Sequence, residues 1–179
     1  MITISDAISH ALGHWWLFAG FLAAATGLYG YAVPRAKAPV FTGNTSATPK
    51  LLDEYLPTWP AARAPVLLDE IGPTGRQALQ QFYLQMDLWF PGPTICLAYA
   101  ALLSLSFPPG TTLSWLNLLA VPALAFDVAE NLNHLVMTRR YPDLTAFSLR
   151  LGPIFTLGKW ALAIALPAIA VIGLLAQHL

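Results

Sequence analysis

The chain has 179 residues, of which 56% are hydrophobic and only 10% are charged. A soluble globular domain of this length carries about a quarter charged residues, so the composition favours a membrane protein. Nine basic and nine acidic side chains cancel, which argues against a nucleic-acid partner because such binding depends on a positive surface. The single cysteine, Cys96, leaves no basis for disulfide redox chemistry or a cysteine-based metal centre.

Four apolar segments are long enough to cross a hydrocarbon layer about 30 Å thick. They cover residues 15–33, 90–107, 113–138 and 151–176. The third contains Asp127 and Glu130 and the fourth contains Lys159, whereas the first two carry no charge. These segments predict a single all-α membrane domain, residues 1–179, folded as a polytopic bundle of four transmembrane helices.

The basic residues are distributed unevenly around these spans. Those outside the membrane lie between the first and second spans, or in and beside the segment between the third and fourth. By the positive-inside rule, both of these loops are cytoplasmic and both termini are outside. No Lys or Arg precedes the first span, so a cleaved signal peptide is disfavoured. We expect a multi-pass membrane protein.

The first loop, residues 34–89, is too long to be only a connector. Its first part is rich in Pro, Thr, Ser and Ala, which predicts an extended chain over the membrane surface. From Thr74 to Trp89 the apolar residues have helical spacing after a Gly-Pro-Thr start signal, which predicts an interfacial or cytoplasmic helix. Pro91 and Pro93 then suit the first turn of the second transmembrane helix.

Ionisable side chains inside an apolar span are costly, and they therefore mark candidate functional sites. In the third span, Asp127, Glu130, Asn131 and His134 are spaced i, i+3, i+4 and i+7. This spacing places all four on one face of a helix. One side of the third helix is therefore expected to avoid lipid and to face other helices.

The fourth span carries a matching stripe of small and polar residues, including Thr156 and Lys159. At 1.5 Å per residue, Glu130 and Lys159 both lie about 12 Å from the cytoplasmic boundary. We therefore expect one polar pocket in the cytoplasmic half of the bundle. The candidate catalytic residues are Asp87, Asp127, Glu130 and Lys159, and the candidate binding residues are Tyr83, Asn131, His134, Thr156, Arg139, Arg140 and Arg150, with the arginines around the mouth of the pocket.

In this pocket three carboxylates would face one ammonium group, that of Lys159. A low-dielectric interior penalises surplus charge. Either one carboxyl group is protonated, or an arginine such as Arg76 or Arg139 folds inward, or a cation fills the site. A divalent cation is one candidate, since carboxylate, amide and imidazole groups are suitable ligands.

Metal ligands, if there are any, would be Asp127, Glu130 and His134. A haem held by two histidines is disfavoured, because His14 and His134 belong to opposite ends of their helices. The sequence assigns no other cofactor. The same polar residues also fit a purely structural role, with Glu130 and Lys159 as an ion pair between helices.

Several residues between 68 and 160 occur in an order that is also found in other membrane proteins. They are the segment LDEIGPTGR at 68–76, Tyr83, Asp87, Phe90-Pro91, Asp127-x-x-Glu130-Asn131 and Lys159-Trp160. This order resembles a pattern in small bacterial four-helix integral membrane proteins to which no activity is attached, and on this resemblance the bacterial inner (plasma) membrane is the expected location. The resemblance implies the four-helix fold and the importance of Asp87, Asp127, Glu130, Asn131 and Lys159, and nothing about their chemistry.

Three functions fit these residues. The favoured one is binding of, or action on, a lipid or other amphipathic small molecule from the cytoplasmic leaflet, with general acid–base groups at one depth and arginines suited to an anionic headgroup. The second is an accessory or assembly subunit whose polar cluster is structural. The third is proton or cation conduction. Expected partners are membrane lipids, together with other membrane subunits or a second copy of the chain.

Overall fold

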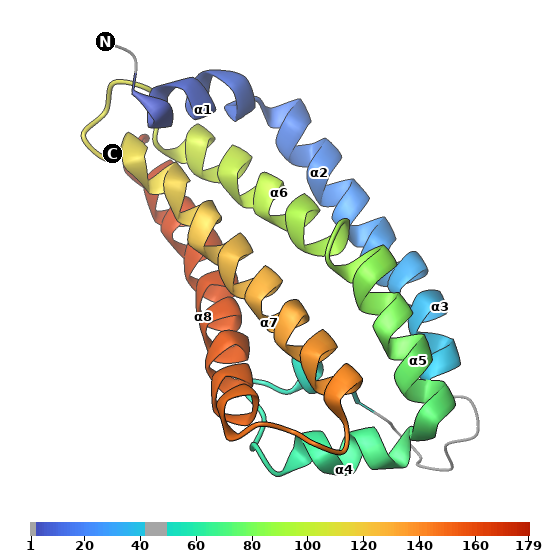
Figure 1. Cartoon of the computed structure of the whole chain (residues 1–179). Coiled ribbons are helices and arrows are strands. Elements are labelled where there is room, and N and C mark those ends of the chain that lie inside the picture. Colours follow the sequence, from blue (N-terminus) through green and yellow to red (C-terminus); the bar gives the residue numbers. More distant parts are fainter. Residues whose placement is uncertain (1–2, 42–49) are drawn as a thin grey trace.

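The computed structural model of the chain describes residues 3–41 and 50–179, and every regular element in this part is helical. Figure 1 shows an elongated bundle with the N- and C-terminal ends at the same end. The segments that run along the bundle cover residues 15–41, 72–106, 120–140 and 146–176. The described part of the protein is therefore all-α, as the composition and the apolar segments predicted.

The first long segment begins at Trp15 and stays helical to Phe41. It consists of α2 (Trp15–Gly27), a π-helical turn η1 (Leu28–Ala32), α3 (Val33–Lys37) and a 3-10 turn η2 (Ala38–Phe41). Pro34 lies in the first turn of α3, and the wider π turn directly before it accommodates a residue that cannot continue a regular α-helix. The helix therefore extends beyond residue 33, where the sequence predicted an extended chain. Residues 42–49 of that predicted chain lie outside the described residues.

The remainder of the first loop is also largely helical. It contains a 3-10 turn η3 (Leu52–Glu54), α4 (Arg63–Glu70), α5 (Gly72–Phe82) and a π-helical turn η4 (Tyr83–Asp87). Gly72 has a φ of +63°, which glycine adopts readily and which turns the chain between α4 and α5. In Figure 1, α4 lies across the end of the bundle and α5 runs nearly in line with α6.

The helix predicted at residues 74–89 corresponds to α5 and η4, and it is part of the bundle. Its apolar side chains Leu79, Phe82 and Tyr83 are buried, and α5 packs against α7. A helix lying on the membrane surface would bury that side in the lipid, at the boundary between headgroups and acyl chains. The apolar face of this helix finds protein partners in the bundle, and the interfacial or cytoplasmic position stays a prediction.

Three further helices complete the bundle: α6 (Pro91–Ser106), α7 (Ala120–Arg140) and α8 (Ala146–Ala176). Pro91 occupies the first turn of α6, where the missing N–H costs no helical hydrogen bond. α8 begins at a cap, because the Thr145 hydroxyl accepts a hydrogen bond of 3.1 Å from the Ser148 backbone N–H. α6, α7 and α8 pack against one another, and α2 packs on α6.

The end of the bundle that holds both termini is covered by a short helix, α1 (Ile4–Leu12), which the sequence reasoning did not predict. A hydrogen-bonded pair between Thr3 and Asp6 caps its start. The buried Asn117 side chain, in the 3-10 turn η5 (Ser114–Leu119), donates to the Ser5 carbonyl oxygen at 2.9 Å and to the Ser9 hydroxyl at 2.8 Å. Neutral polar groups therefore fix α1 to this end.

Three helical segments of the described chain are long and apolar enough to cross a membrane: Trp15–Phe41, Gly72–Ser106 and Ala146–Ala176. Their outer faces are apolar, as Ile164 and Ile172 on α8 illustrate with exposed fractions of 66% and 67%. α7 has 21 residues, but the polar face around Asp127 and Glu130 makes it less apolar than the other three. The chain therefore has the character of a membrane protein, with three helices that qualify as spans by composition.

Candidate functional site

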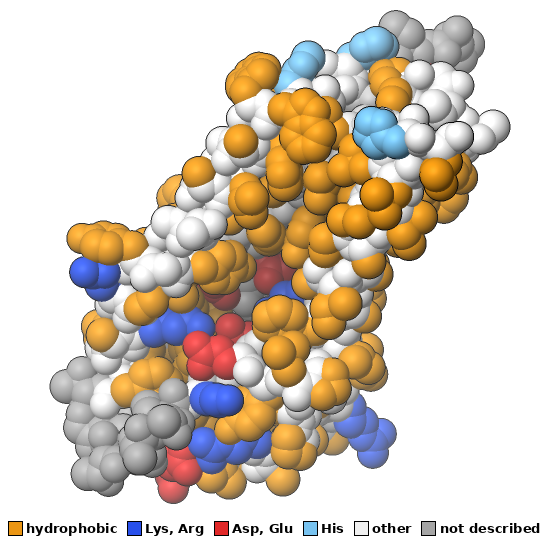
Figure 2. Space-filling model, turned by 180° about the vertical axis from the view of Figure 1, so that it is seen from behind, with side chains coloured by type: hydrophobic (Ala, Val, Ile, Leu, Met, Phe, Trp, Pro, Cys, Tyr) orange, Lys and Arg blue, Asp and Glu red, His pale blue; other side chains and the backbone are white. Residues whose placement is uncertain are grey.

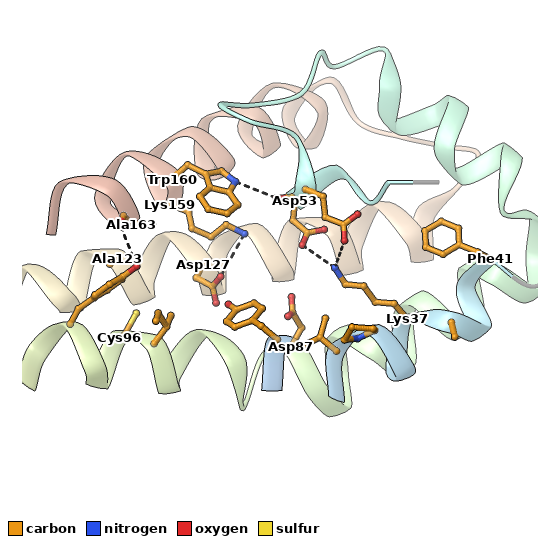
Figure 3. A pocket seen from close by; sticks show the side chains of 17 residues that line it. Lys37, Phe41, Asp53, Asp87, Cys96, Ala123, Asp127, Lys159, Trp160 and Ala163 are labelled. Carbon is orange, nitrogen blue, oxygen red and sulfur yellow. Dashed lines mark hydrogen bonds and ion pairs between the residues drawn. The ribbon is translucent and has the colours of Figure 1, made fainter. Parts of the chain in front are cut away.

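A cavity of about 630 Å³ lies among the long helices of the bundle. Its walls are formed by the first long helix, by η4 and α6, by α7 and α8, and by the 3-10 turn η3. Figure 3 shows charged side chains converging on its centre, including Asp127, Lys159 and Lys37. An apolar part, with Cys96, Ala123 and Ala163, continues toward the end of the bundle that holds the termini. The cavity thus has a charged part and an apolar part.

The cavity opens to the side of the bundle. Figure 2 shows this face, with a hollow that has acidic and basic side chains at its bottom and largely apolar flanks. Tyr29 and Val33 of the first long helix line one side, and Trp160 and Ala163 of α8 line another. These two helices are both packed on α6, and the hollow lies between them.

Lys159 is at the centre of the charged region. Its ammonium group forms an ion pair with the Glu130 carboxylate, and its Nζ is 3.7 Å from Oδ1 of Asp127. The structure therefore brings together the two residues that were expected at equal depth on the third and fourth spans. Because Glu130 and Asp127 lie about one helical turn apart on α7, one lysine can contact both.

Glu130 belongs to a packed region behind the cavity rather than to the cavity wall. Its side chain is fully buried and accepts a hydrogen bond from the Thr156 hydroxyl. The indole N–H of Trp59 donates to the same hydroxyl at 2.9 Å. Trp59 fits here because Gly152 has no side chain, since a Cβ at that position would overlap the indole ring. Trp59 comes from the first loop, and the sequence reasoning did not identify it.

His134 and Asn131 extend this packed region along α7. The Tyr83 hydroxyl lies 3.1 Å from Nδ1 of His134 and is hydrogen-bonded to it. Both side chains are buried, at 2% exposure each, and Asn131 is 1% exposed. None of the three is among the residues that line the cavity. Of the polar stripe predicted on the third span, only Asp127 faces the cavity.

Asp127 is held against the start of α6. A Cβ on Gly92 would overlap Oδ2 of Asp127, so the glycine in the Phe-Pro-Gly-Pro sequence allows the carboxylate to lie close to the helix backbone. Oδ1 faces Lys159, whereas Oδ2 is buried without a hydrogen-bond partner in the described chain. Asp127 therefore has one oxygen whose hydrogen-bonding capacity is unused.

A second group of charges lines the cavity near η3, and the sequence reasoning missed it. Nζ of Lys37 is 3.5 Å from Oδ2 of Asp53 and 3.0 Å from Oε1 of Glu54. Burial raises the pKa of the Asp53 carboxyl, but Lys37 and Lys159 lower it more, so this pKa lies below its ordinary value. In the sequence this group is visible only as an acidic pair after two leucines at 51–54. That pair lines the cavity because the loop that carries it folds back onto the bundle.

Asp87 lies in η4 and lines the cavity. In Figure 3 its carboxylate points into the cavity, between the Lys37 and Asp127 side chains. No hydrogen bond or ion pair involves this carboxylate in the described chain, whereas the ammonium groups of Lys37 and Lys159 are paired with other acids. Asp87 is therefore the cavity carboxylate with the least compensation.

The arginines expected at the mouth of the pocket lie elsewhere. Arg139, Arg140 and Arg150 are exposed at the ends of α7 and α8, and none of them lines the cavity. Arg76 donates to the Leu68 carbonyl oxygen at 2.6 Å and does not fold into the site. The basic residue that joins Lys159 in the cavity is Lys37, because the first helix continues past the predicted end of its span.

The described residues contain no group of three His, Cys, Asp or Glu side chains placed to hold a metal ion. Asp127, Glu130 and His134, the three ligands considered from the sequence, have different neighbours. Glu130 meets Thr156 and Lys159, and His134 meets Tyr83. These three side chains of α7 therefore contact different neighbours and do not converge on one point.

No protein-family model, curated protein or solved structure matches the chain. The resemblance based on residues 68–160 consequently adds nothing to the geometry of the site. The cavity, its charges and the helices that surround it are therefore the features that bear on function.

Proposed function

We propose that the chain is a four-span membrane protein that binds an amphipathic small molecule, such as a lipid, in its lateral cavity. The observation that carries this proposal is the form of the cavity, which joins a charged region to an apolar one and opens between two helices apolar enough to cross a membrane. Its volume of about 630 Å³ lies in the usual range for small-molecule pockets. The headgroup of an amphiphile matches the charged region, and its alkyl chain matches the apolar region.

The arrangement of the bundle supports α7 as the fourth span. α7 runs antiparallel to α8 along the bundle, and both termini lie at one end (Figure 1). Three crossings would leave the termini on opposite sides of a membrane, whereas four crossings leave them on the same side. The charged face of α7 is covered by protein at Glu130, Asn131 and His134, which lowers the cost of placing these groups at membrane depth.

The distribution of basic residues supports the predicted orientation. In Figure 2 the Lys and Arg side chains occupy the part of the bundle away from the histidines near the termini. By the positive-inside rule, that end faces the cytoplasm and the termini face outward. A ligand entering through the lateral opening would then come from the cytoplasmic leaflet, with its headgroup in the charged region and its chain near Cys96 and Ala163. The assignment to a bacterial inner membrane rests on the resemblance alone.

Within this proposal the residues have separate roles. Asp87, Asp127 and Lys159 line the cavity and would contact the ligand. Glu130 is fully buried and would position Lys159 through their ion pair. If the protein is an enzyme, Asp87 and Asp127 are the groups placed for acid–base chemistry on a bound molecule.

Photolabelling in a lipid bilayer tests this function. The probe is a dodecyl phosphocholine with a diazirine at the end of its chain, added to the protein in lipid nanodiscs. We expect crosslinks on cavity residues such as Cys96 and Tyr99, and their loss in Ala163→Trp, which fills the apolar part. The neighbouring Ala161 is exposed, so Ala161→Trp is the matched control. Labelling confined to outward residues such as Ile164 would overturn the proposal.

The packed surroundings of Glu130 favour a second candidate, an accessory or assembly subunit with a structural polar cluster. Glu130, Thr156 and Trp59 form a closed set of contacts that needs no ligand. The photolabelling experiment separates the two functions, since a structural subunit would give no labelling in the cavity. Proton or cation conduction has less support, because apolar side chains such as Leu103, Phe107 and Leu166 form a core in the other half of the bundle.

A further inference from the structure

The charges that line the cavity are unequal in number. Two ammonium groups, on Lys37 and Lys159, face four carboxylates, on Asp53, Glu54, Asp87 and Asp127. Lys37 is within ion-pair distance of Asp53 and Glu54. Lys159 is shared between Asp127 and the buried Glu130 behind the wall. Both cations of the cavity are therefore already paired, and the surplus charge is negative.

Part of this surplus lies on side chains of η4 and α7 that line the cavity. Asp87 points into the cavity without an ion pair or hydrogen bond in the described chain (Figure 3). Asp127 of α7 also lines this cavity, and its Oδ2 is buried against Gly92 of α6 and has no hydrogen-bond partner in the described chain. An uncompensated carboxylate in a low-dielectric site is costly, so a positive group placed between these two residues would be stabilised.

The neighbouring side chains suit an ammonium group as well. Trp160 and Tyr29 line the same cavity, and aromatic rings attract alkylated ammonium groups through their faces. The arginines that would have favoured an anionic headgroup are exposed at the helix ends, and none lines the cavity. The arginine side chains that were expected to recognise an anionic headgroup are therefore not part of the cavity.

We infer that the cavity selects amphiphiles with a cationic headgroup, whose ammonium group lies between the Asp87 and Asp127 carboxylates. The inference rests on the proposed binding of an amphiphile, and it specifies the chemical class of the ligand. The alkyl chain occupies the apolar part beside Ile95, Cys96 and Ala123. This orientation puts the headgroup nearer the basic end of the bundle than the chain, as for a lipid of the cytoplasmic leaflet.

Three photoreactive probes with the same diazirine-bearing dodecyl chain test this selectivity in nanodiscs. Their headgroups are trimethylammonium, an uncharged hydroxyl and sulfate. Labelling of Cys96 and Tyr99 is divided by labelling of Ile164, which is 66% exposed on the outer face of α8. This ratio corrects for how much of each probe enters the bilayer. We expect the ratio for the ammonium probe to exceed that for the sulfate probe by about tenfold.

Two isosteric variants locate the selectivity. Asp87→Asn removes the unpaired negative charge of the cavity, and it should lower the ammonium ratio by about tenfold while leaving the ratio for the hydroxyl probe unchanged. Asp143→Asn removes an exposed carboxylate outside the cavity and should change neither ratio. If Asp87→Asn failed to fold, the parent protein alone would still rank the three headgroups.

The outcomes distinguish this inference from the function on which it rests. Cavity labelling that is equal for all three headgroups, or strongest for sulfate, overturns the cationic selectivity and leaves amphiphile binding in place. An ammonium preference that survives in Asp87→Asn also contradicts the assigned headgroup position. No cavity labelling by any probe overturns both.

Discussion

The polar face of α7 meets two different environments about one helical turn apart. Around Glu130 the side chains of Thr156, Trp59 and Lys159 form closed contacts, and the carboxylate is fully buried. Around Asp127 the same face opens onto the cavity, and one carboxylate oxygen has no partner in the described chain. The difference teaches that one polar stripe can contribute both to a packed region and to a cavity wall, with Lys159 shared between the two.

Removing the charge of Glu130 tests the packed region and should have the largest effect. In Glu130→Gln, Lys159 loses its buried partner and keeps only Asp127 at 3.7 Å. Breaking a buried ion pair is strongly destabilising, so we expect a loss of about 3 kcal/mol in the free energy of unfolding. Thermal unfolding in a mild detergent would measure it as a lower transition temperature.

The matched control is the same substitution in an exposed pair. Glu70 forms an ion pair with Arg63 at 2.8 Å, with side chains that are 36% and 22% exposed. Glu70→Gln should cost less than about 1 kcal/mol. Equal transition temperatures for the two variants would show that the Glu130 pair contributes no more than a surface pair, and the distinction between the two environments would fail.

A methyl group at Gly92 tests the cavity side of the comparison. In Gly92→Ala the new Cβ would overlap Oδ2 of Asp127 and push the carboxylate away from α6. Overpacking of this kind costs about 2 kcal/mol, and the displaced carboxylate should weaken labelling by the ammonium probe. In Gly20→Ala the new Cβ meets no atom within 4 Å, so this control should keep both stability and labelling. Unchanged labelling in Gly92→Ala would show that the position of Asp127 is unimportant.

Tyr83→Phe tests a neutral contact of the packed region. The substitution removes the hydroxyl that is hydrogen-bonded to Nδ1 of His134 at 3.1 Å and leaves a buried imidazole nitrogen without that partner. We expect a loss of about 1 kcal/mol, seen in thermal unfolding, with probe labelling unaffected because neither residue lines the cavity. Tyr31→Phe, at an exposed site, is the control. Reduced labelling in Tyr83→Phe would place this pair in the binding site after all.

The sequence was informative wherever a regular helix relates position to depth. Glu130 and Lys159 could be paired because both helices rise 1.5 Å per residue, and because charges at equal depth in apolar spans favour a common contact. The all-helical architecture followed from the same regularity. The number of membrane-spanning helices follows less directly from the sequence. Three helices are long and apolar enough to cross a membrane, and the fourth span is inferred from the position of the termini.

The parts that escaped prediction depend on tertiary contacts of irregular segments. Asp53 and Trp59 reach the bundle because residues 50–62 fold back over α8, where Thr58 donates to the Pro153 carbonyl oxygen at 2.7 Å and Trp160 donates to the Asp53 carbonyl oxygen at 3.2 Å. No spacing rule predicts such a return. Lys37 escaped because the π turn that carries the helix past Pro34 has no strong sequence signature.

A polar stripe on one helix also does not reveal which of its members will face a cavity. The spacing placed Asp127, Glu130, Asn131 and His134 on one arc, but the helices around α7 divide that arc. Gly92 brings α6 close to Asp127, and Gly152 admits Trp59 near Glu130. The division is therefore set by small residues on neighbouring helices, whose effect appears only when the helices are packed.

The smallest loss of stability is expected at Asp87, where the expected effect on probe labelling is large. Asp87 has no ion pair or hydrogen bond in the described chain and lies among more carboxylates than ammonium groups. Asp87→Asn should therefore cost less than about 0.5 kcal/mol in the free energy of unfolding, and any larger shift should be stabilising because the surplus negative charge falls. Thermal unfolding of Asp87→Asn beside Glu130→Gln measures this contrast directly. A loss comparable to that of Glu130→Gln would mean that Asp87 supports the fold, and the cavity carboxylates would then have to be regarded as structural.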